Sequence, residues 1–155
     1  MGAVLTQHPD LAAAALPAVG VLDMLRFHRF TAGATWIPEY GNPDDPERFV
    51  QALTYSPLHN VRPGSSYPAT LVLTGDHDDR VVPSHSHKFT AALQYAQAGD
   101  QPILTRIEVS TGHGIGKPTA LLAAEWADML AFAAHHTGLQ LPASGNRRTE
   151  HEQTE

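Results

Sequence analysis

Two short apolar runs, each followed by a polar loop and a helical pattern, organise the second half of the chain. Residues 69–74 form an apolar, partly β-branched run between turn residues, which is typical of a strand buried on both faces. Residues 103–109 alternate in character and predict a second strand. Residues 83–99 and about 119–136 carry apolar positions at helical spacing, so a predicted helix follows each predicted strand.

The first half of the chain has a weaker pattern. Residues 2–6 indicate the end of an amphipathic helix, and the small apolar residues of 12–21 favour a buried strand. Residues 23–30 suit a short helix, whereas residues 31–42 predict an irregular loop with large side chains. An acidic start signal with proline then predicts a helix over residues 47–55.

The alternation of strand, loop and helix predicts an α/β fold with a parallel sheet and helices on both faces. In such sheets, ligands bind beyond the carboxyl ends of the strands. The loops at residues 76–80 and 112–116 both follow predicted strands, so we expect them to face one crevice. We expect the last helix to turn an apolar side, with Trp126 in it, toward the core. This side comprises Leu121, Leu122, Trp126, Met129, Leu130 and Phe132.

Composition sets limits on size and on partners. The chain has 155 residues, 42% of them hydrophobic and 17% charged, which is enough for one domain or part of one. We expect the folded part over residues 1–138 and a polar, disordered tail over residues 139–155. The 10 Lys and Arg against 16 Asp and Glu give a net charge of -6, which argues against nucleic acid or anionic membranes as partners. The absence of cysteine excludes disulfides, thiolate metal sites and a thiol nucleophile.

The sequence gives no signal for a membrane segment. No apolar stretch approaches the roughly 18 to 20 residues that a membrane helix needs. The apolar run at residues 11–22 has no basic segment before it, unlike a secretory signal peptide. We expect a cytoplasmic protein, and a periplasmic one is the alternative if a signal lies upstream of Met1.

An acid in one loop and a histidine in the next provide the candidate chemistry. Asp78 follows the first predicted strand and His113 lies in the glycine-rich loop after the second. A carboxylate so placed can orient and polarise an imidazole that acts as general base. On the residues alone, His113 could equally be a loop histidine, and Asp78 a solvated turn carboxylate like its neighbours Asp76 and Asp79.

A metal site is the less favoured interpretation of the same region. Its ligands would come from Asp76, His77, Asp78, His85 and His87. His85 and His87 are two positions apart, which directs them to different sides of a helix. We therefore predict no metal and no other cofactor.

Four motifs occur in order over about residues 2–137. They are Val-Gly-Val-Leu-Asp-Met-Leu-Arg-Phe-His (19–28), Tyr-Ser-Pro-Leu-His-Asn-Val (55–61), Asp-His-Asp-Asp-Arg-Val-Val-Pro (76–83) and Gly-His-Gly-Ile-Gly-Lys-Pro-Thr (112–119). Together they resemble the catalytic domain of the prolyl oligopeptidase family of serine endopeptidases. The resemblance implies the C-terminal portion of an α/β-hydrolase fold.

The resemblance also implies a role for each candidate residue. Asp78 would be the acid of a catalytic triad, His113 its base, and Arg80 would hold a substrate carbonyl. The pocket for proline would be lined by Val21, Trp36, Tyr40 and Val81. A flat aromatic wall suits proline, whose ring is rigid and whose nitrogen carries no hydrogen. The alternatives are a core role for the two aromatic residues and a surface ion pair for Arg80.

The nucleophile of such a triad is not found in this sequence. In α/β-hydrolases a serine in a Gly-x-Ser-x-Gly turn precedes the acid and the histidine, and no serine here has those flanking glycines. The resemblance places the serine, an oxyanion tyrosine and a β-propeller upstream of Met1. We therefore expect a C-terminal fragment of an endopeptidase that cleaves short peptides after proline, inactive without its N-terminal part. The alternatives are a non-catalytic remnant or assembly module that pairs with a separate N-terminal half, and another serine hydrolase of the same fold.

Overall fold

The computed structural model describes residues 1–114 and 116–140. Its strands are β1 (Ala14–Ala15), β2 (Ala69–Gly75) and β3 (Ile103–Glu108), which form a parallel sheet in the order β1-β2-β3. The α-helices are α1 (Gly2–Gln7), α2 (Ile37–Tyr40), α3 (Pro46–Tyr55), α4 (Ser84–Ala96) and α5 (Thr119–Thr137). The 3-10 helices are η1 (Pro9–Leu11), η2 (Phe27–Arg29), η3 (Thr31–Trp36) and η4 (Leu58–Asn60).

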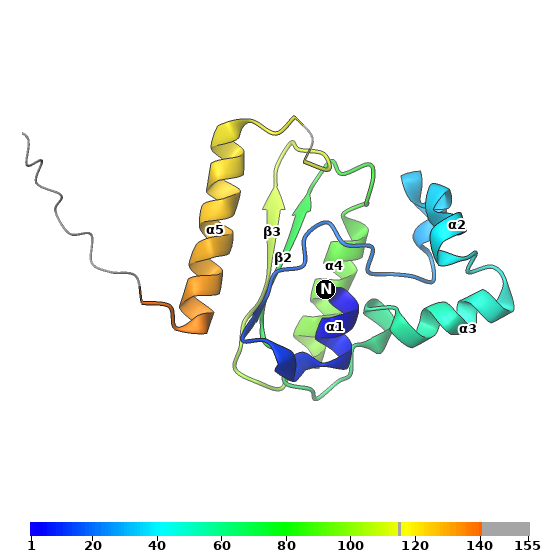
Figure 1. Ribbon diagram of the computed structural model, residues 1–155, viewed down its shortest axis with the longest axis horizontal. Helices are drawn as coiled ribbons and strands as arrows, with labels where there is room; N and C mark the ends of the chain where they lie inside the picture. The colour runs from blue at the N-terminus through cyan, green and yellow to red at the C-terminus, as the bar shows by residue number, and fades with distance from the viewer. Residues whose placement is uncertain (115, 141–155) are drawn as a thin grey trace, which may run out of the picture.

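The sheet lies between helices. Figure 1 shows α5 on one side of the strands and α1 and α4 on the other, as the parallel connection of β2 to β3 through α4 requires. The segment from η2 to α2 projects at the same end of the molecule as the carboxyl ends of β2 and β3 (Figure 1). In the described ranges, no helix is long and apolar enough to span a membrane.

The core is built around β2, which is buried along its whole length. Val72 packs in one cluster with Phe89 and Leu93 of α4, and all three are fully shielded from solvent. A second, smaller cluster forms around Met24, Phe27 and Ala52 beneath η2 and α3. The apolar run at residues 69–74 therefore has the buried position that its composition predicts.

The helices and strands of the second half agree with the predicted ones, but two predictions for the first half are wrong. Residues 12–21 form only the two-residue strand β1, since Pro17 has no N–H to donate and Val19 has a φ of 42°. Contact with β2 resumes only through a single bridge between Ala18 and Leu73. Residues 31–42 are largely helical (η3 and α2) rather than an irregular loop.

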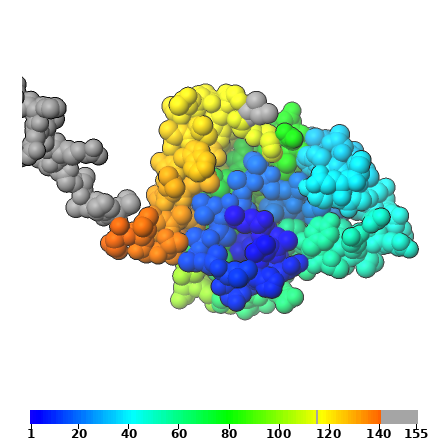
Figure 2. Space-filling view, in the orientation of Figure 1, coloured from blue at the N-terminus to red at the C-terminus, as the bar shows by residue number. Residues whose placement is uncertain are grey.

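The predicted core side of α5 is not buried. No residue of α5 is buried, and Leu122, Trp126 and Leu130 are 43%, 53% and 63% exposed. These three residues are spaced four apart, so they form one stripe along the helix, which we call the α5 stripe. The expectation that Trp126 belongs to the core is therefore wrong for this structure, because α5 packs mainly against β1 and β2 and leaves the stripe exposed. Figure 2 shows α5 (yellow to orange) along one side of the molecule.

A buried ionic cluster joins α4 to the segment that leads into η2. The side chain of Asp23 is fully buried, and its Oδ2 accepts hydrogen bonds from Arg26 Nε at 2.9 Å and Lys88 Nζ at 2.5 Å. The backbone N–H of Asp23 donates to Nδ1 of His85 at 3.1 Å. Burial lowers the pKa of His85 to about 4, so its ring is neutral near pH 7.

The buried His85 is expected to make the protein acid-labile. In the unfolded chain this histidine is protonated below about pH 6.5, whereas in the folded chain it stays neutral down to about pH 4. The free energy of unfolding therefore falls as the pH is lowered from 6.5 to about 4. The loss is about 3 kcal/mol at most, at about 1.4 kcal/mol per pKa unit. Urea unfolding at pH 7.5 and pH 5 measures it. A His85→Gln variant should weaken this pH dependence and a variant of the exposed His87, His87→Gln, should keep it; the opposite pattern would disprove the assignment.

Candidate active site

The loops after β2 and β3 pack directly against each other. Gly75 ends β2, and a Cβ at this position would lie 2.6 Å from the carbonyl oxygen of Thr111 and 2.7 Å from that of Gly112. The backbone N–H of His77 donates to the carbonyl oxygen of Thr111 at 3.1 Å. Only glycine allows this close approach, which brings the two predicted site loops into one crevice.

Asp76 adds a second link between these loops. Its Oδ1 accepts hydrogen bonds from the backbone N–H of Thr111 at 3.3 Å and from Nδ1 of His77 at 2.7 Å. These hydrogen bonds, with His77 the largest contributor, lower the pKa of Asp76 to about 2. Asp76 is therefore ionised at neutral pH and engaged with the loop that carries His113.

Asp78 is buried and held in one orientation. Its Oδ1 accepts hydrogen bonds from the backbone N–H groups of Arg80 at 3.0 Å and Val81 at 2.8 Å. Its side chain is fully shielded from solvent. Two fixed donors on one oxygen leave the other oxygen, Oδ2, directed at a single further partner.

That partner is His113. Its Nδ1 lies 2.8 Å from Oδ2 of Asp78, and its side chain is 23% exposed. The carboxylate is an acceptor, so Nδ1 carries the proton and Nε2 keeps a free lone pair. A half-buried imidazole in this tautomer can take up a proton at Nε2, and Asp78 can stabilise the imidazolium that results.

A small cavity of about 90 Å³ adjoins His113. Its walls come from the segment after β1, the carboxyl ends of β2 and β3, the loop after β3 and the first turns of α5. The lining residues include Val19, Gly75, Gly112, Lys117 and Glu125. Lys117 and Glu125 form an ion pair there. The histidine thus borders a polar recess at the carboxyl ends of the strands, where α/β folds bind ligands.

The remaining predicted residues lie in two places. Arg80 has an exposed side chain and Val81 a buried one, both next to Asp78. Trp36 stacks on Phe27 with ring centroids 6.5 Å apart, and Tyr40 meets the same ring edge-on at 5.6 Å. Val21 also packs against the cluster around Phe27. The structure therefore groups three of the four predicted pocket residues at the cluster around Phe27, and the fourth, Val81, lies with Arg80 next to Asp78.

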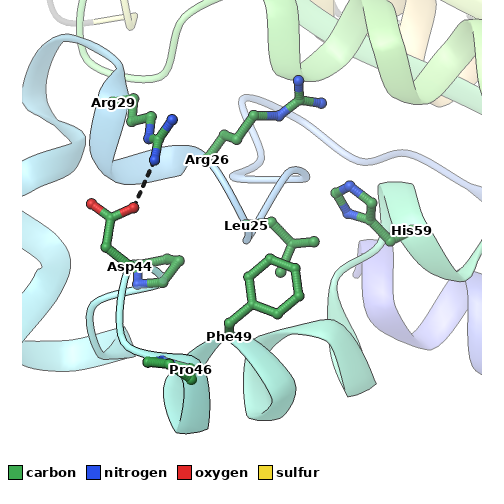
Figure 3. A pocket seen from close by; sticks show the side chains of 8 residues that line it. Leu25, Arg26, Arg29, Asp44, Pro46, Phe49 and His59 are labelled. Atoms are coloured by element: carbon green, nitrogen blue, oxygen red, sulfur yellow. Dashed lines mark hydrogen bonds and ion pairs between the residues drawn. The ribbon is translucent and has the colours of Figure 1, made fainter.

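A separate pocket of about 500 Å³ lies between α3 and the segment around η2 (Figure 3). Figure 3 shows Leu25 and Phe49 on its apolar part, with Arg29 bonded to Asp44 on one side. Its other arginine, Arg26, is bonded to Asp23. Both cations are thus already paired, and neither Asp78 nor His113 lines this pocket.

The histidines and aspartates near the loops are not arranged as metal ligands. Within residues 1–114 and 116–140, no group of three His, Asp or Glu side chains could hold a metal ion. His85 is buried against Asp23, whereas His87 is exposed, so the two point to different sides of α4. The interactions of Asp78 and His113 are those of an acid–base pair.

A parallel sheet whose successive strands are followed by a carboxylate and then by its histidine partner has the chain order of an α/β-hydrolase. Sequence comparison gives the family. The prolyl oligopeptidase family matches residues 1–140, so the chain belongs to that family.

Curated relatives and solved structures agree with this assignment. A prolyl endopeptidase from Elizabethkingia meningoseptica is 52% identical over 141 residues, and a dual function macrocyclase-peptidase from Galerina marginata is 45% identical over 143 residues. These matches cover 90% and 91% of this chain and 20% of each relative. Oligopeptidase B from Leishmania major superposes with a TM-score of 0.84 at 31% identity, over 89% of this chain and 19% of that one. The chain thus spans about a fifth of the length of these relatives.

Sequence reasoning did not single out two residues whose contacts connect distant segments, Gly75 and Asp23. Gly75 lies between the predicted strand at residues 69–74 and the loop at 76–80, and a glycine at the end of a buried strand can mark a close backbone approach. Asp23 was read only as part of a motif, although an aspartate within the apolar stretch at residues 19–25 needs buried partners. In both cases the partners lie far away in the sequence.

Proposed function

We propose that this chain supplies the acid and the base of a serine peptidase that cleaves short peptides after proline. The observation that carries the proposal is the 2.8 Å hydrogen bond from His113 Nδ1 to an Asp78 carboxylate that two backbone N–H groups hold in place. This is the geometry that makes an imidazole an effective general base. The family relationship, with curated relatives that are prolyl endopeptidases, supports peptide cleavage as the class of reaction.

The reaction requires a serine from a segment outside the printed sequence. His113 removes the serine proton at Nε2 as the serine attacks the peptide carbonyl, and Asp78 stabilises the imidazolium. His113 then gives that proton to the leaving amine, which leaves an acyl-enzyme on the serine. Water, activated by the same histidine, releases the acid and restores the serine. No step draws on a metal or a cofactor.

Under this proposal the serine has two possible origins. It lies either on the same polypeptide or on a separate chain, and we call the complex of this chain with a serine-bearing segment the reconstituted enzyme. Structures of prolyl oligopeptidase B from Galerina marginata bound to substrates include variants in which a serine, a histidine or an aspartate is replaced by alanine. Those are the three residue types that the proposed mechanism combines.

The cluster of Phe27, Trp36 and Tyr40 is proposed to form the pocket for proline. Trp36 is stacked on Phe27, and Tyr40 is packed against the same ring, so the wall is rigid before substrate arrives. Val21 and Val81 would complete the apolar lining, and the exposed Arg80 would hold a substrate carbonyl. Proline presents a flat apolar ring with no N–H, so aromatic contact selects it without a hydrogen bond.

Replacing Trp36 by Ala is expected to reduce the preference for proline. In the reconstituted enzyme, kcat/KM for a Gly-Pro substrate should fall by about 10 to 200-fold, the range expected for loss of apolar pocket contacts. A Gly-Ala substrate should be affected much less. Chromogenic substrates of both kinds measure the ratio, and Tyr95→Ala, at an aromatic residue that is 85% exposed on α4, provides the control. An equal loss for both substrates would place Trp36 in the general fold rather than in the pocket.

A second candidate role, assembly with another polypeptide segment, is favoured by the α5 stripe. Leu122, Trp126 and Leu130 are exposed on a helix that contacts β1, and β1 has one sheet neighbour, β2. A segment that extends the sheet beyond β1 would lie against this helix and could cover the stripe. Contiguous exposed apolar residues are typical of interaction surfaces, which supports this second role.

Charge on the α5 stripe is expected to weaken that assembly. Trp126→Lys should raise the Kd for the serine-bearing segment by about tenfold or more, since truncation of a buried aromatic anchor costs 2 kcal/mol or more. Isothermal calorimetry with the purified segment measures the change. The control variant is Tyr95→Lys, which should leave Kd unchanged because Tyr95 is 85% exposed on α4. Equal binding by both variants would rule out the stripe as the contact surface.

A further inference from the structure

Two side chains of α4, His85 and Lys88, contact the segment that carries the proposed pocket at two residues, Asp23 and Phe30. At Asp23, His85 Nδ1 accepts the backbone N–H at 3.1 Å and Lys88 Nζ donates to Oδ2 at 2.5 Å. At Phe30, the ring packs against the His85 ring in a T-shaped arrangement with centroids 5.2 Å apart, and Lys88 Nζ lies over the Phe30 ring, 5.3 Å from its centroid. Each of the two α4 residues therefore makes one contact with the acid and one with the aromatic ring.

These two points bracket the base of the pocket. Asp23 precedes η2, and Phe30 lies between η2 and η3. Between them is Phe27, the ring on which Trp36 stacks and against which Tyr40 packs. Fixing both ends of this short stretch fixes the position of the Phe27 ring, and the pocket wall follows it.

The start of α4 is also linked to the proposed catalytic pair, Asp78 and His113. The backbone N–H of His85 donates to the carbonyl oxygen of Val82 at 3.1 Å. The neighbouring Val81 donates its N–H to Asp78 Oδ1 at 2.8 Å. A short series of contacts therefore runs from Asp78 through the start of α4 to Asp23.

The charge of Asp23 is retained despite complete burial. Burial alone would raise its pKa, but the hydrogen bond and the charge of Lys88, with smaller contributions from Arg26 and His59, hold the pKa below its ordinary value. Oδ1 has no hydrogen-bond partner, and its neighbour His59 Nδ1 is 4.0 Å away. Buried ion pairs of this kind often contribute less to net stability than to fixing one arrangement of the elements they join.

We propose that Asp23 and Lys88 are positioning residues that hold the proline pocket in register with the Asp78–His113 pair. The inference rests on the proposed function, since it assigns the pocket to the segment around Phe27. Neither Asp23 nor Lys88 belongs to the Asp78–His113 pair. The ion pair of Asp23 and Lys88 therefore affects where the substrate binds and not the proton transfer. Its loss should therefore change substrate binding before it changes the rate of the bound substrate.

The test uses Lys88→Met, with Lys88→Arg as the charge-preserving control, in the reconstituted enzyme. The Lys88 side chain is 32% exposed and Arg26 still pairs with Asp23, so the fold should tolerate the change. KM for a Gly-Pro substrate should rise about tenfold with kcat within about twofold, as expected for one lost hydrogen bond to a charged group. Lys88→Arg should restore most of the wild-type KM.

Hydrogen exchange followed by mass spectrometry gives a readout that does not need activity. In Lys88→Met, amides of residues 27–40 should exchange faster, while those of residues 103–113 should keep their wild-type rates. If the wild-type complex hydrolyses nothing, the proposed function fails, and the exchange comparison still decides whether Lys88 positions this segment. Wild-type exchange over residues 27–40 in both Lys88→Met and Asp23→Asn, or a fall in kcat at unchanged KM, would overturn the inference.

Discussion

Replacing His113 by Ala in the reconstituted enzyme is expected to lower kcat by about 10⁶-fold, the effect seen when the base of a serine protease triad is removed. The physical reason is the loss of the imidazole that is proposed to take the serine proton and return it to the leaving amine. His113 is held by Asp78 at 2.8 Å in the tautomer that this proton transfer requires. Steady-state hydrolysis of a chromogenic Gly-Pro substrate measures the loss.

The matched control for this experiment is His87→Ala. His87 is an exposed histidine on α4, so its removal deletes an imidazole without touching the pair. Its kcat should equal that of the unsubstituted enzyme. A loss of less than tenfold in His113→Ala would show that another group acts as the base.

Asp78→Asn is expected to cost about 10⁴-fold in kcat, close to the effect of the same change in other triads. The two backbone N–H groups of Arg80 and Val81 need an acceptor, so the amide oxygen of asparagine must take the place of Oδ1. Its NH₂ group then points at His113 and donates to Nδ1. This hydrogen bond forces the proton of the neutral ring onto Nε2, and His113 can no longer accept a proton from the serine.

Asp79→Asn controls for the loss of one negative charge in the same loop. Asp79 is exposed and immediately follows Asp78 in the chain. Its kcat should stay near the unsubstituted value. Similar losses in the two variants would indicate a general electrostatic effect of the loop instead of a specific tautomer effect at His113.

The sequence predicted those parts of the fold that depend on local pattern. The continuous apolar run of β2 identifies a strand buried on both faces, and Asp45 caps α3 by accepting the backbone N–H groups of Glu47 and Arg48. The placement of Asp78 and His113 at one edge also followed, because parallel strands end on the same side. Local pattern was sufficient where each element satisfies its own backbone groups.

The errors arise where distant segments decide the outcome. Residues 31–42 became helical because Trp36 and Tyr40 pack on Phe27, a contact that no periodicity reports. The spacing of the apolar residues of α5 indicated a core face, yet Leu122, Trp126 and Leu130 are exposed in the part of the chain that the structure describes. The buried Asp23 has partners more than sixty positions away in the chain, so its role could not be read from its neighbours.

The most direct test of the central claim is the hydrolysis of a chromogenic Gly-Pro substrate by this chain mixed with a purified segment that carries Gly-x-Ser-x-Gly. We predict no turnover by either component alone, turnover on mixing, and its loss when the chain carries His113→Ala. Turnover that persists with His113→Ala, or a folded complex that shows none with the unsubstituted chain, would contradict the assignment of Asp78 and His113 as the acid–base pair of a serine peptidase.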